Sequence, residues 1–105
     1  IVALPLAQTR QTAADGMRAT QIGDVTFAHL REYLDDIVTV NEEEIAEAMR
    51  RVAINGRLTT EPSGAVSVAA ALFRQEALPP SNKTVAVISG GNVDATLFAE
   101  ILGSG

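Results

Sequence analysis

The chain has 105 residues, a formal net charge of −5 at pH 7 and no cysteine. This length allows one small domain or a piece of a larger one, and the absence of cysteine excludes disulfides, thiolate catalysis and zinc–cysteine sites. The acidic balance, with scattered lysine and arginine, argues against a nucleic-acid partner. No apolar run approaches the roughly 18 residues of a membrane span, and residues 1–10 lack the features of a signal peptide. We therefore expect a cytoplasmic protein without a membrane partner.

The first 23 residues carry little periodic pattern and are interpreted as an irregular lead-in that belongs to the same domain as the rest. The remaining part, 24–105, begins where Asp24 can cap a helix. Apolar side chains recur at helical spacing and predict a helix over residues 25–35; they are Phe27, Leu30, Tyr33 and Leu34.

The β-branched run at residues 37–40 predicts a short strand. A second helix follows, with Asn41 as its N-cap and Glu44 three residues later in capping-box position. Asn55 and Gly56 are predicted to end this helix in a conformation with positive φ. Its buried face is expected to consist of Ile45, Ala48, Met49, Val52 and Ala53.

A third helix is predicted to start with Pro62 at its first position, where the missing N–H does no harm. The apolar run at residues 84–88 lacks alternation and predicts a strand covered on both faces, as in parallel sheets. Asp94 can cap a last helix, to about Leu102. This order predicts an α/β fragment with parallel strands covered by helices. Two strands are too few for a stable sheet, so we expect an incomplete domain.

The turn Ser89-Gly90-Gly91-Asn92 follows the second predicted strand and precedes a helix. In open α/β sheets, ligands bind at such turns, where free backbone N–H groups and the helix dipole point outward. Glycine also lets the backbone approach a ligand closely. A small polar or anionic ligand and a tight turn that needs glycine only for its conformation explain these residues equally well.

The other residues whose side chains could bind a ligand or take part in catalysis give weaker predictions of function. Glu61 is either a carboxylate anchor near a ligand or, as we favour, an acid stabilised by a helix N-terminus. Asp15 and Gly16 form a turn by default. His29 has no evident catalytic partner, and the acidic run at residues 42–44 points in divergent directions, so neither predicts a catalytic or metal site.

The segments Thr12–Gly16, Thr60–Ala65 and Ile88–Asp94 occur in this order, with Leu34–Val40 and an acidic helix start between the first two. This ordered set resembles the C-terminal part of the serine/threonine dehydratase and serine racemase family, which are pyridoxal-phosphate enzymes of fold type II. The resemblance covers residues from about 12 to 102. It implies that the chain is the C-terminal fragment of the large domain of such an enzyme.

The resemblance also implies pyridoxal 5'-phosphate as the cofactor and assigns residues to it. Ser89 matches the hydroxyl that bonds the pyridine nitrogen, and Gly90–Asn92 match the turn that holds it. Asp15–Gly16 match a loop whose backbone passes beside the cofactor ring, and Glu61 matches a carboxylate near its edge. A neutral serine does not enforce protonation of the ring nitrogen, which implies a weaker electron sink and favours loss of a β-hydroxyl.

Several parts of the family's site precede the matched region: the Schiff-base lysine, the glycine-rich phosphate cradle, the substrate-carboxylate loop and the divalent-cation ligands. Lys83 does not match the setting of that lysine, so we expect no catalytic residue and no metal site in this chain, which by itself should be inactive. Thr59 and Thr60 stand where family members are often apolar, and Arg57 stands where a lysine is common.

We therefore expect the C-terminal segment of a pyridoxal-phosphate-dependent L-serine/L-threonine dehydratase, an ammonia-lyase that eliminates water to give a 2-oxo acid and ammonia. A serine racemase of the same family is the alternative enzyme. A non-catalytic anion-binding or assembly fragment is the alternative of a different class. The implied partners are the N-terminal remainder of the enzyme, with its lysine and phosphate loop, a small amino-acid substrate, and further copies in a homo-oligomer.

Overall fold

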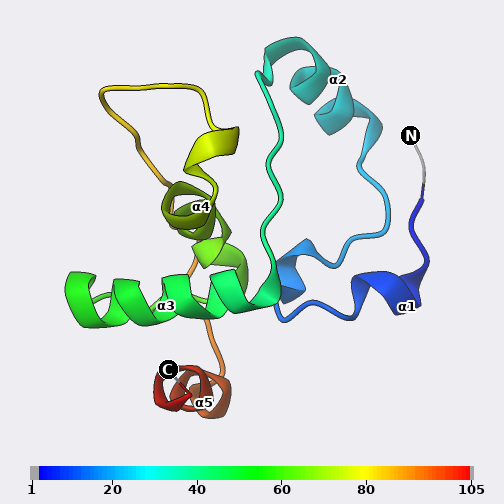
Figure 1. Cartoon of the computed structure of the whole chain (residues 1–105). Coiled ribbons are helices and arrows are strands. Elements are labelled where there is room, and N and C mark those ends of the chain that lie inside the picture. The colour runs from blue at the N-terminus through cyan, green and yellow to red at the C-terminus, as the bar shows by residue number, and fades with distance from the viewer. Residues whose placement is uncertain (1–2, 105) are drawn as a thin grey trace. The chain divides into compact units, whose positions relative to one another are not determined.

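The computed structural model describes residues 3–104, which contain helices and connecting segments (Figure 1). Contacts divide the chain into two compact units, Ile1–Ile37 and Val38–Gly105. No helix among the described residues is long and apolar enough to cross a membrane. The helices are α1 (Leu6–Thr9), α2 (Asp24–Tyr33), α3 (Glu42–Gly56), α4 (Pro62–Phe73) and α5 (Ala95–Gly103), with 3-10 turns η1 (Asp15–Met17) and η2 (Gln75–Ala77).

The first unit has more local structure than an irregular lead-in. It contains α1 and η1, and the guanidinium of Arg18 donates two hydrogen bonds to the carbonyl of Thr12, at 3.0 and 2.8 Å. Ala14, the N-cap residue of η1, is buried. The α2 helix begins at Asp24 itself, so the prediction of Asp24 as N-cap is wrong by one residue. Gly23 is the N-cap and provides no side chain for the cap.

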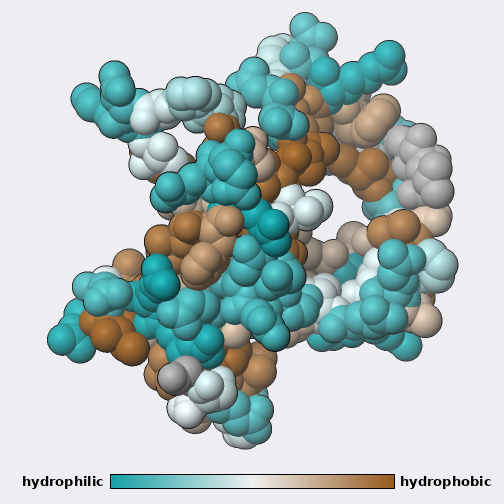
Figure 2. Space-filling model, viewed as in Figure 1, coloured by the Kyte–Doolittle hydropathy of each residue, from teal (hydrophilic) through white to brown (hydrophobic). Residues whose placement is uncertain are grey.

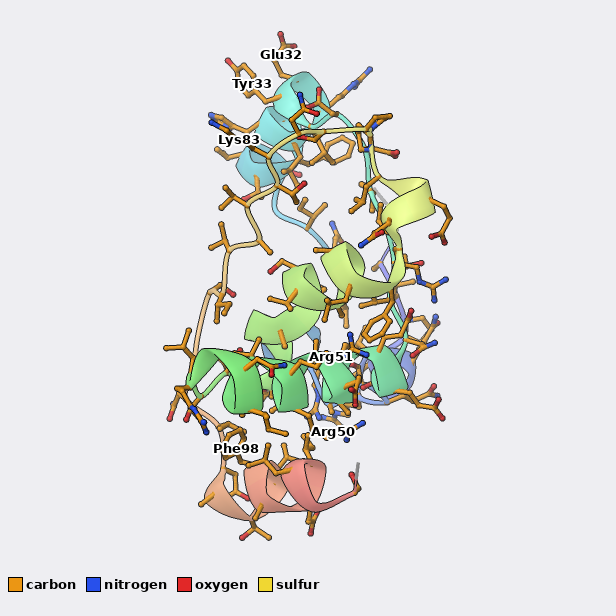
Figure 3. All side chains as sticks on the ribbon, turned by 60° about the vertical axis from the view of Figure 1, so that its left-hand side comes forward. Glu32, Tyr33, Arg50, Arg51, Lys83 and Phe98 are labelled. Carbon is orange, nitrogen blue, oxygen red and sulfur yellow. The ribbon has the colours of Figure 1, made fainter. Side chains whose placement is uncertain are left out.

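The second unit is built around α3, which packs against α4 on one side and α5 on the other (Figure 1). Its core consists of small and apolar side chains from α3 and α4: Ile45, Ala48, Met49, Ala65 and Ala69. Arg50 lies between α3 and α5 (Figure 3) and donates to the carbonyl of Ile101 at 3.0 Å, which satisfies a free carbonyl in the last turn of α5.

The start of α3 confirms the predicted capping box. The side chain of Asn41 accepts from the N–H of Glu44, and the side chain of Glu44 accepts from the N–H of Asn41, both at 2.8 Å. Its end differs from the prediction, because Gly56 stays helical and Arg57 takes the left-handed conformation, with φ 56°. The N–H groups of Arg57 and Leu58 both donate to the carbonyl of Val52, which offsets the cost of that conformation.

The starts of α4 and α5 also agree with the sequence. Pro62 is the first residue of α4, and the side chain of Asp94 accepts from the N–H of Leu97 at 3.2 Å. Each signal depends on a few adjacent residues, since a missing N–H or a short acceptor side chain acts only on the first turn of its own helix.

Neither predicted strand is a strand in this structure. Residues 37–40 and 84–88 lie outside the helices, and the described residues contain no strand at all. A strand exists through backbone hydrogen bonds to a neighbouring strand, and the described part of the chain supplies none. Val85 and Val87 are 87% and 68% exposed, so the run predicted to be covered on both faces is largely uncovered. The predicted parallel sheet is therefore not confirmed.

Candidate cofactor-binding site

The Ser89–Asn92 turn is held against the beginning of α4 by hydrogen bonds. The carbonyl of Gly90 accepts from the N–H of Glu61 and from Oγ1 of Thr60, both at 3.1 Å. Just before the turn, Oγ of Ser67 donates to the carbonyl of Val87 at 2.6 Å. The backbone around the turn is thereby fixed to residues about 20 to 30 positions earlier in the chain.

Two glycines, Gly64 and Gly91, allow this close approach of backbone to backbone. A Cβ at Gly64 would overlap the carbonyl oxygen of Gly90 and would lie 2.8 Å from Oγ1 of Thr60. A Cβ at Gly91 would lie 2.6 Å from the carbonyl oxygen of Thr59. At Gly64 and Gly91, therefore, glycine serves packing, and neither has a positive φ.

Glu61 lies in direct contact with the turn. It is the N-cap residue of α4, but its side chain makes no capping hydrogen bond. Its carboxylate occupies the space where a Cβ of Gly90 would be. This contact places Glu61 beside the Ser89–Asn92 turn. A role in stabilising the helix dipole alone would not require the carboxylate to point at the turn.

Ser89 and Asn92 flank the two glycines, and both are exposed. The N–H of Val93 donates to the carbonyl of Gly91 at 3.0 Å, which closes the turn immediately before the Asp94 cap of α5. The turn thus presents one hydroxyl and one carboxamide to its surroundings, close to the first N–H groups of a helix.

Asp15 and Gly16 belong to the other compact unit, where they are the first two residues of η1 and are exposed. Within residues 3–104, no group of three or more His, Asp or Glu side chains is arranged to hold a metal ion.

Sequence reasoning missed the contributions of Thr60 and Gly64. Two signals pointed to them. A glycine inside the first turn of a helix costs about 1 kcal/mol relative to alanine, so Gly64 needs a packing reason. A threonine directly before an N-cap places a hydroxyl where the helix start already concentrates backbone donors and acceptors.

Comparison with known proteins identifies the family. A sequence model described as pyridoxal-phosphate dependent enzyme matches residues 3–90. The L-threonine ammonia-lyase of Thermotoga maritima is 38% identical over 96 residues, which are 91% of this chain and 23% of that protein. The serine racemase of Schizosaccharomyces pombe is 39% identical over 95 residues, which are 90% of this chain and 29% of that protein.

The structure gives a consistent result. It matches maize serine racemase with a TM-score of 0.76 and 34% identity, over 90% of this chain and 30% of that one. The chain thus spans between 23% and 30% of the length of these proteins. It belongs to the family of pyridoxal-phosphate dependent enzymes, of fold type II, whose cofactor is pyridoxal phosphate.

Proposed function

We propose that this chain is the C-terminal part of the catalytic domain of an L-serine/L-threonine ammonia-lyase that uses pyridoxal phosphate. The observation that carries the proposal is the Ser89–Asn92 turn, which is clamped to the start of α4 and carries one hydroxyl. The identity of 38% to a threonine ammonia-lyase over nearly the whole chain supports it. In this proposal the 1–23 segment and residues 24–105 belong to one domain of the longer enzyme.

The polar groups of the turn suit the nitrogen end of the cofactor ring. The Ser89 hydroxyl can donate to a pyridine nitrogen, which is an acceptor. Neither residues 59–64 nor residues 87–94 include a lysine or an arginine, so these two segments offer no cation for a phosphate group. The residues present therefore fit the neutral ring, and the phosphate cradle is assigned to the remainder of the enzyme.

Within this site each residue has a distinct task. Ser89 would donate a hydrogen bond to the ring nitrogen without transferring a charge to it, and Gly90–Asn92 would hold the backbone that presents the hydroxyl. Glu61, whose carboxylate lies against Gly90, would place that carboxylate near the edge of the ring. Asp15–Gly16 are proposed to pass their backbone beside the ring in the complete enzyme. When bound, pyridoxal phosphate draws electrons from the α-carbon of the substrate, which labilises the bonds around it.

The overall reaction removes the α-proton and the β-hydroxyl of the amino acid as water, which leaves an enamine. The enamine tautomerises to an imine, and a water molecule hydrolyses the imine to the 2-oxo acid and ammonia. Serine racemase is the second candidate, favoured by the identity of 39% to the racemase of Schizosaccharomyces pombe. A racemase removes the same proton and returns one to the opposite face. The Ser89 hydroxyl is assigned from a resemblance to both enzymes and suits either one, so the products formed by the complete enzyme distinguish them.

We also propose that this chain is inactive by itself. The covalent lysine and the phosphate cradle would come from the N-terminal remainder, and the complete enzyme would form a homo-oligomer. The uncovered run at residues 84–88, with Val85 and Val87 exposed, is proposed to become a strand by pairing with that remainder, because an unpaired edge of this kind readily accepts another strand.

The test is product analysis with the full-length polypeptide that carries this chain. It would be supplied with L-threonine or L-serine, and both the 2-oxo acid and the D-amino acid would be quantified. The proposal expects the 2-oxo acid to be the main product. A predominance of D-serine would assign the racemase, and cofactor-loaded protein that forms neither product would contradict both.

Two variants of Ser89 connect the activity to the turn. Ser89→Ala should weaken cofactor binding, and Ser89→Asp should change the ratio of the two products because aspartate enforces protonation of the ring nitrogen. Ser81→Ala is the matched control, since Ser81 is exposed and its hydroxyl bonds only the nearby backbone of Lys83. An unchanged product ratio in the Asp variant would count against the assigned role of Ser89.

A further inference from the structure

Thr60 places a hydroxyl in a fully buried position. Its exposure is 0%, and with Met49 it is one of the two largest fully buried side chains among the described residues. A buried hydroxyl is costly unless it is hydrogen-bonded. Oγ1 of Thr60 lies 3.0 Å from the carbonyl oxygen of Glu61 and 3.1 Å from that of Gly90, so its one hydrogen is shared between two acceptors.

The two acceptors have different consequences. The carbonyl of Glu61 belongs to the adjacent residue, and a bond to it is local. The carbonyl of Gly90 lies 30 residues away and directly follows Ser89 in the chain. It also accepts a hydrogen bond from the N–H of Glu61, so two adjacent residues both donate to this one carbonyl of the turn. Two donors at about 3 Å restrict the rotation of that peptide unit more than one donor would.

The packing of Gly64 against the same carbonyl restricts it further. The α-carbon of Gly64 lies so close that any Cβ there would overlap the Gly90 oxygen, and it would lie 2.9 Å from the Gly90 nitrogen. The peptide unit between Gly90 and Gly91 is therefore fixed by hydrogen bonds from Thr60 and Glu61 and by contact with Gly64. Because Gly64 also lies close to the Gly90 nitrogen, the peptide unit that joins Ser89 to Gly90 is restricted as well, which limits how Ser89 can point.

We propose that Thr60 is a positioning residue for Ser89, whose hydrogen bond to the Gly90 carbonyl fixes the direction in which the Ser89 hydroxyl meets the cofactor nitrogen. The inference rests on the proposed role of Ser89. Thr60 itself would not touch the cofactor. It acts through the backbone of the turn, and loss of its hydroxyl leaves the Glu61 N–H bond in place but allows the turn to move.

The test uses the full-length polypeptide that carries this chain, loaded with pyridoxal phosphate labelled with nitrogen-15 in the ring. Two quantities are measured in each variant: the NMR chemical shift of the bound ring nitrogen and the dissociation constant of the cofactor. Thr60→Val keeps the shape of the side chain and removes the hydroxyl. It should move the nitrogen shift in the same direction as Ser89→Ala and weaken cofactor binding about 3- to 10-fold, as expected for one hydrogen bond.

Three further variants separate positioning from stability. Thr60→Ser keeps the hydroxyl and should retain the wild-type nitrogen shift. The double variant Thr60→Val/Ser89→Ala should bind the cofactor no more weakly than Ser89→Ala alone, because the two residues act on one bond. Thr59→Val is the matched control, since exposed Thr59 faces Gly91 with its backbone carbonyl, and it should behave as wild type.

Each contrary outcome has a definite meaning. If Ser89→Ala moves the nitrogen shift and Thr60→Val does not, Thr60 is not a positioning residue, while the role of Ser89 stands. The same conclusion follows if Thr60→Val lowers only the melting temperature, or if Thr60→Ser loses the wild-type shift, because packing rather than the hydroxyl would then matter. If Ser89→Ala itself leaves the shift unchanged, the proposed role of Ser89 fails and this inference fails with it.

Discussion

The α2 and α3 helices carry the same kind of sequence signal but differ in what their apolar faces meet. Both have apolar residues at helical spacing. The α3 helix buries Ile45, Ala48 and Met49, whereas α2 buries no residue, and Phe27 and Leu30 remain 37% and 40% exposed. Figure 2 shows this apolar surface over α2. Periodicity therefore predicts which face of a helix is apolar, but only a neighbouring element makes that face stabilising.

The two helices also differ at their starts. The α3 helix has a complete capping box, in which two backbone N–H groups find side-chain acceptors. The α2 helix follows Gly23 and has no side-chain cap. Local and tertiary stabilisation thus coincide in α3, and both are weaker in α2. Substitutions in the full-length polypeptide that carries this chain can measure how large this difference is.

The largest expected effect comes from the core of α3. Met49→Ala removes a side chain with 0% exposure and leaves a cavity, which should lower the free energy of unfolding by about 2–5 kcal/mol. Leu30→Ala on α2 should change it by no more than about 0.5 kcal/mol, as is usual for exposed positions. Urea denaturation followed by far-UV circular dichroism compares the two. Equal losses would show that α2 is as well buried as α3.

A second, smaller effect is expected from the contact between α4 and the turn. Gly64→Ala forces a Cβ against the Gly90 carbonyl and should lower the free energy of unfolding by about 1–3 kcal/mol. Gly56→Ala is the matched control, because a Cβ there meets nothing within 4 Å and the residue is helical. The control should be neutral or stabilising by up to about 1 kcal/mol. The thermal midpoints of the two variants should therefore move in opposite directions, or only that of Gly64→Ala should fall.

The capping box of α3 allows the difference between α3 and α2, which has no side-chain cap, to be tested on a single hydrogen bond. Asn41→Ala removes the acceptor for the N–H of Glu44 and should lower the free energy of unfolding by about 1 kcal/mol. Asn41→Ser retains an acceptor of similar capping strength and should recover most of this loss. If both variants unfold at the same urea concentration as the wild type, the cap contributes nothing measurable.

The smallest effect is a pH dependence. The N–H of Asn41 lowers the pKa of the Glu44 carboxyl, partial desolvation opposes this, and the guanidinium of Arg74, at 2.6 Å, lowers the pKa further. Because the folded pKa is lower, the contribution is fully present above the ordinary carboxyl pKa of roughly 4.3 and is lost as the pH falls through the folded value. Glu44→Gln should therefore show a shallower loss of stability in acid, measured as urea midpoints between about pH 7 and about pH 3.

Sequence reasoning succeeded where neighbouring residues determine the structure. The Asn41 box, Pro62 at the start of α4 and the Asp94 cap each depend on residues within one helical turn, and all three are confirmed. The runs at residues 37–40 and 84–88 were predicted to be strands, but a strand needs a partner whose position no local pattern states. The same limit explains the end of α3, where the left-handed residue is Arg57 rather than Asn55 or Gly56.

The candidate site shows the same division. The pattern of Ser89–Asn92 indicated a backbone that something approaches closely, and the structure supplies one such neighbour in Thr59–Gly64. That pairing joins positions about 30 residues apart, and neither segment alone contains the information that Gly64 and Gly90 touch. The sequence alone favoured a helix-dipole role for Glu61, and only the resemblance to a known family assigned it to the site. Its carboxylate does contact Gly90.

The interlocking of Gly64 with the Gly90 carbonyl has a practical consequence for protein engineering. A designer who transplants only Ser89–Asn92 into another scaffold would move the turn without the surface that shapes it. Residues 59–64 would have to be transferred as a second segment, with glycine kept at position 64. In a mutational library, position 64 should accordingly tolerate fewer substitutions than Ser89 itself, in any selection for folded protein.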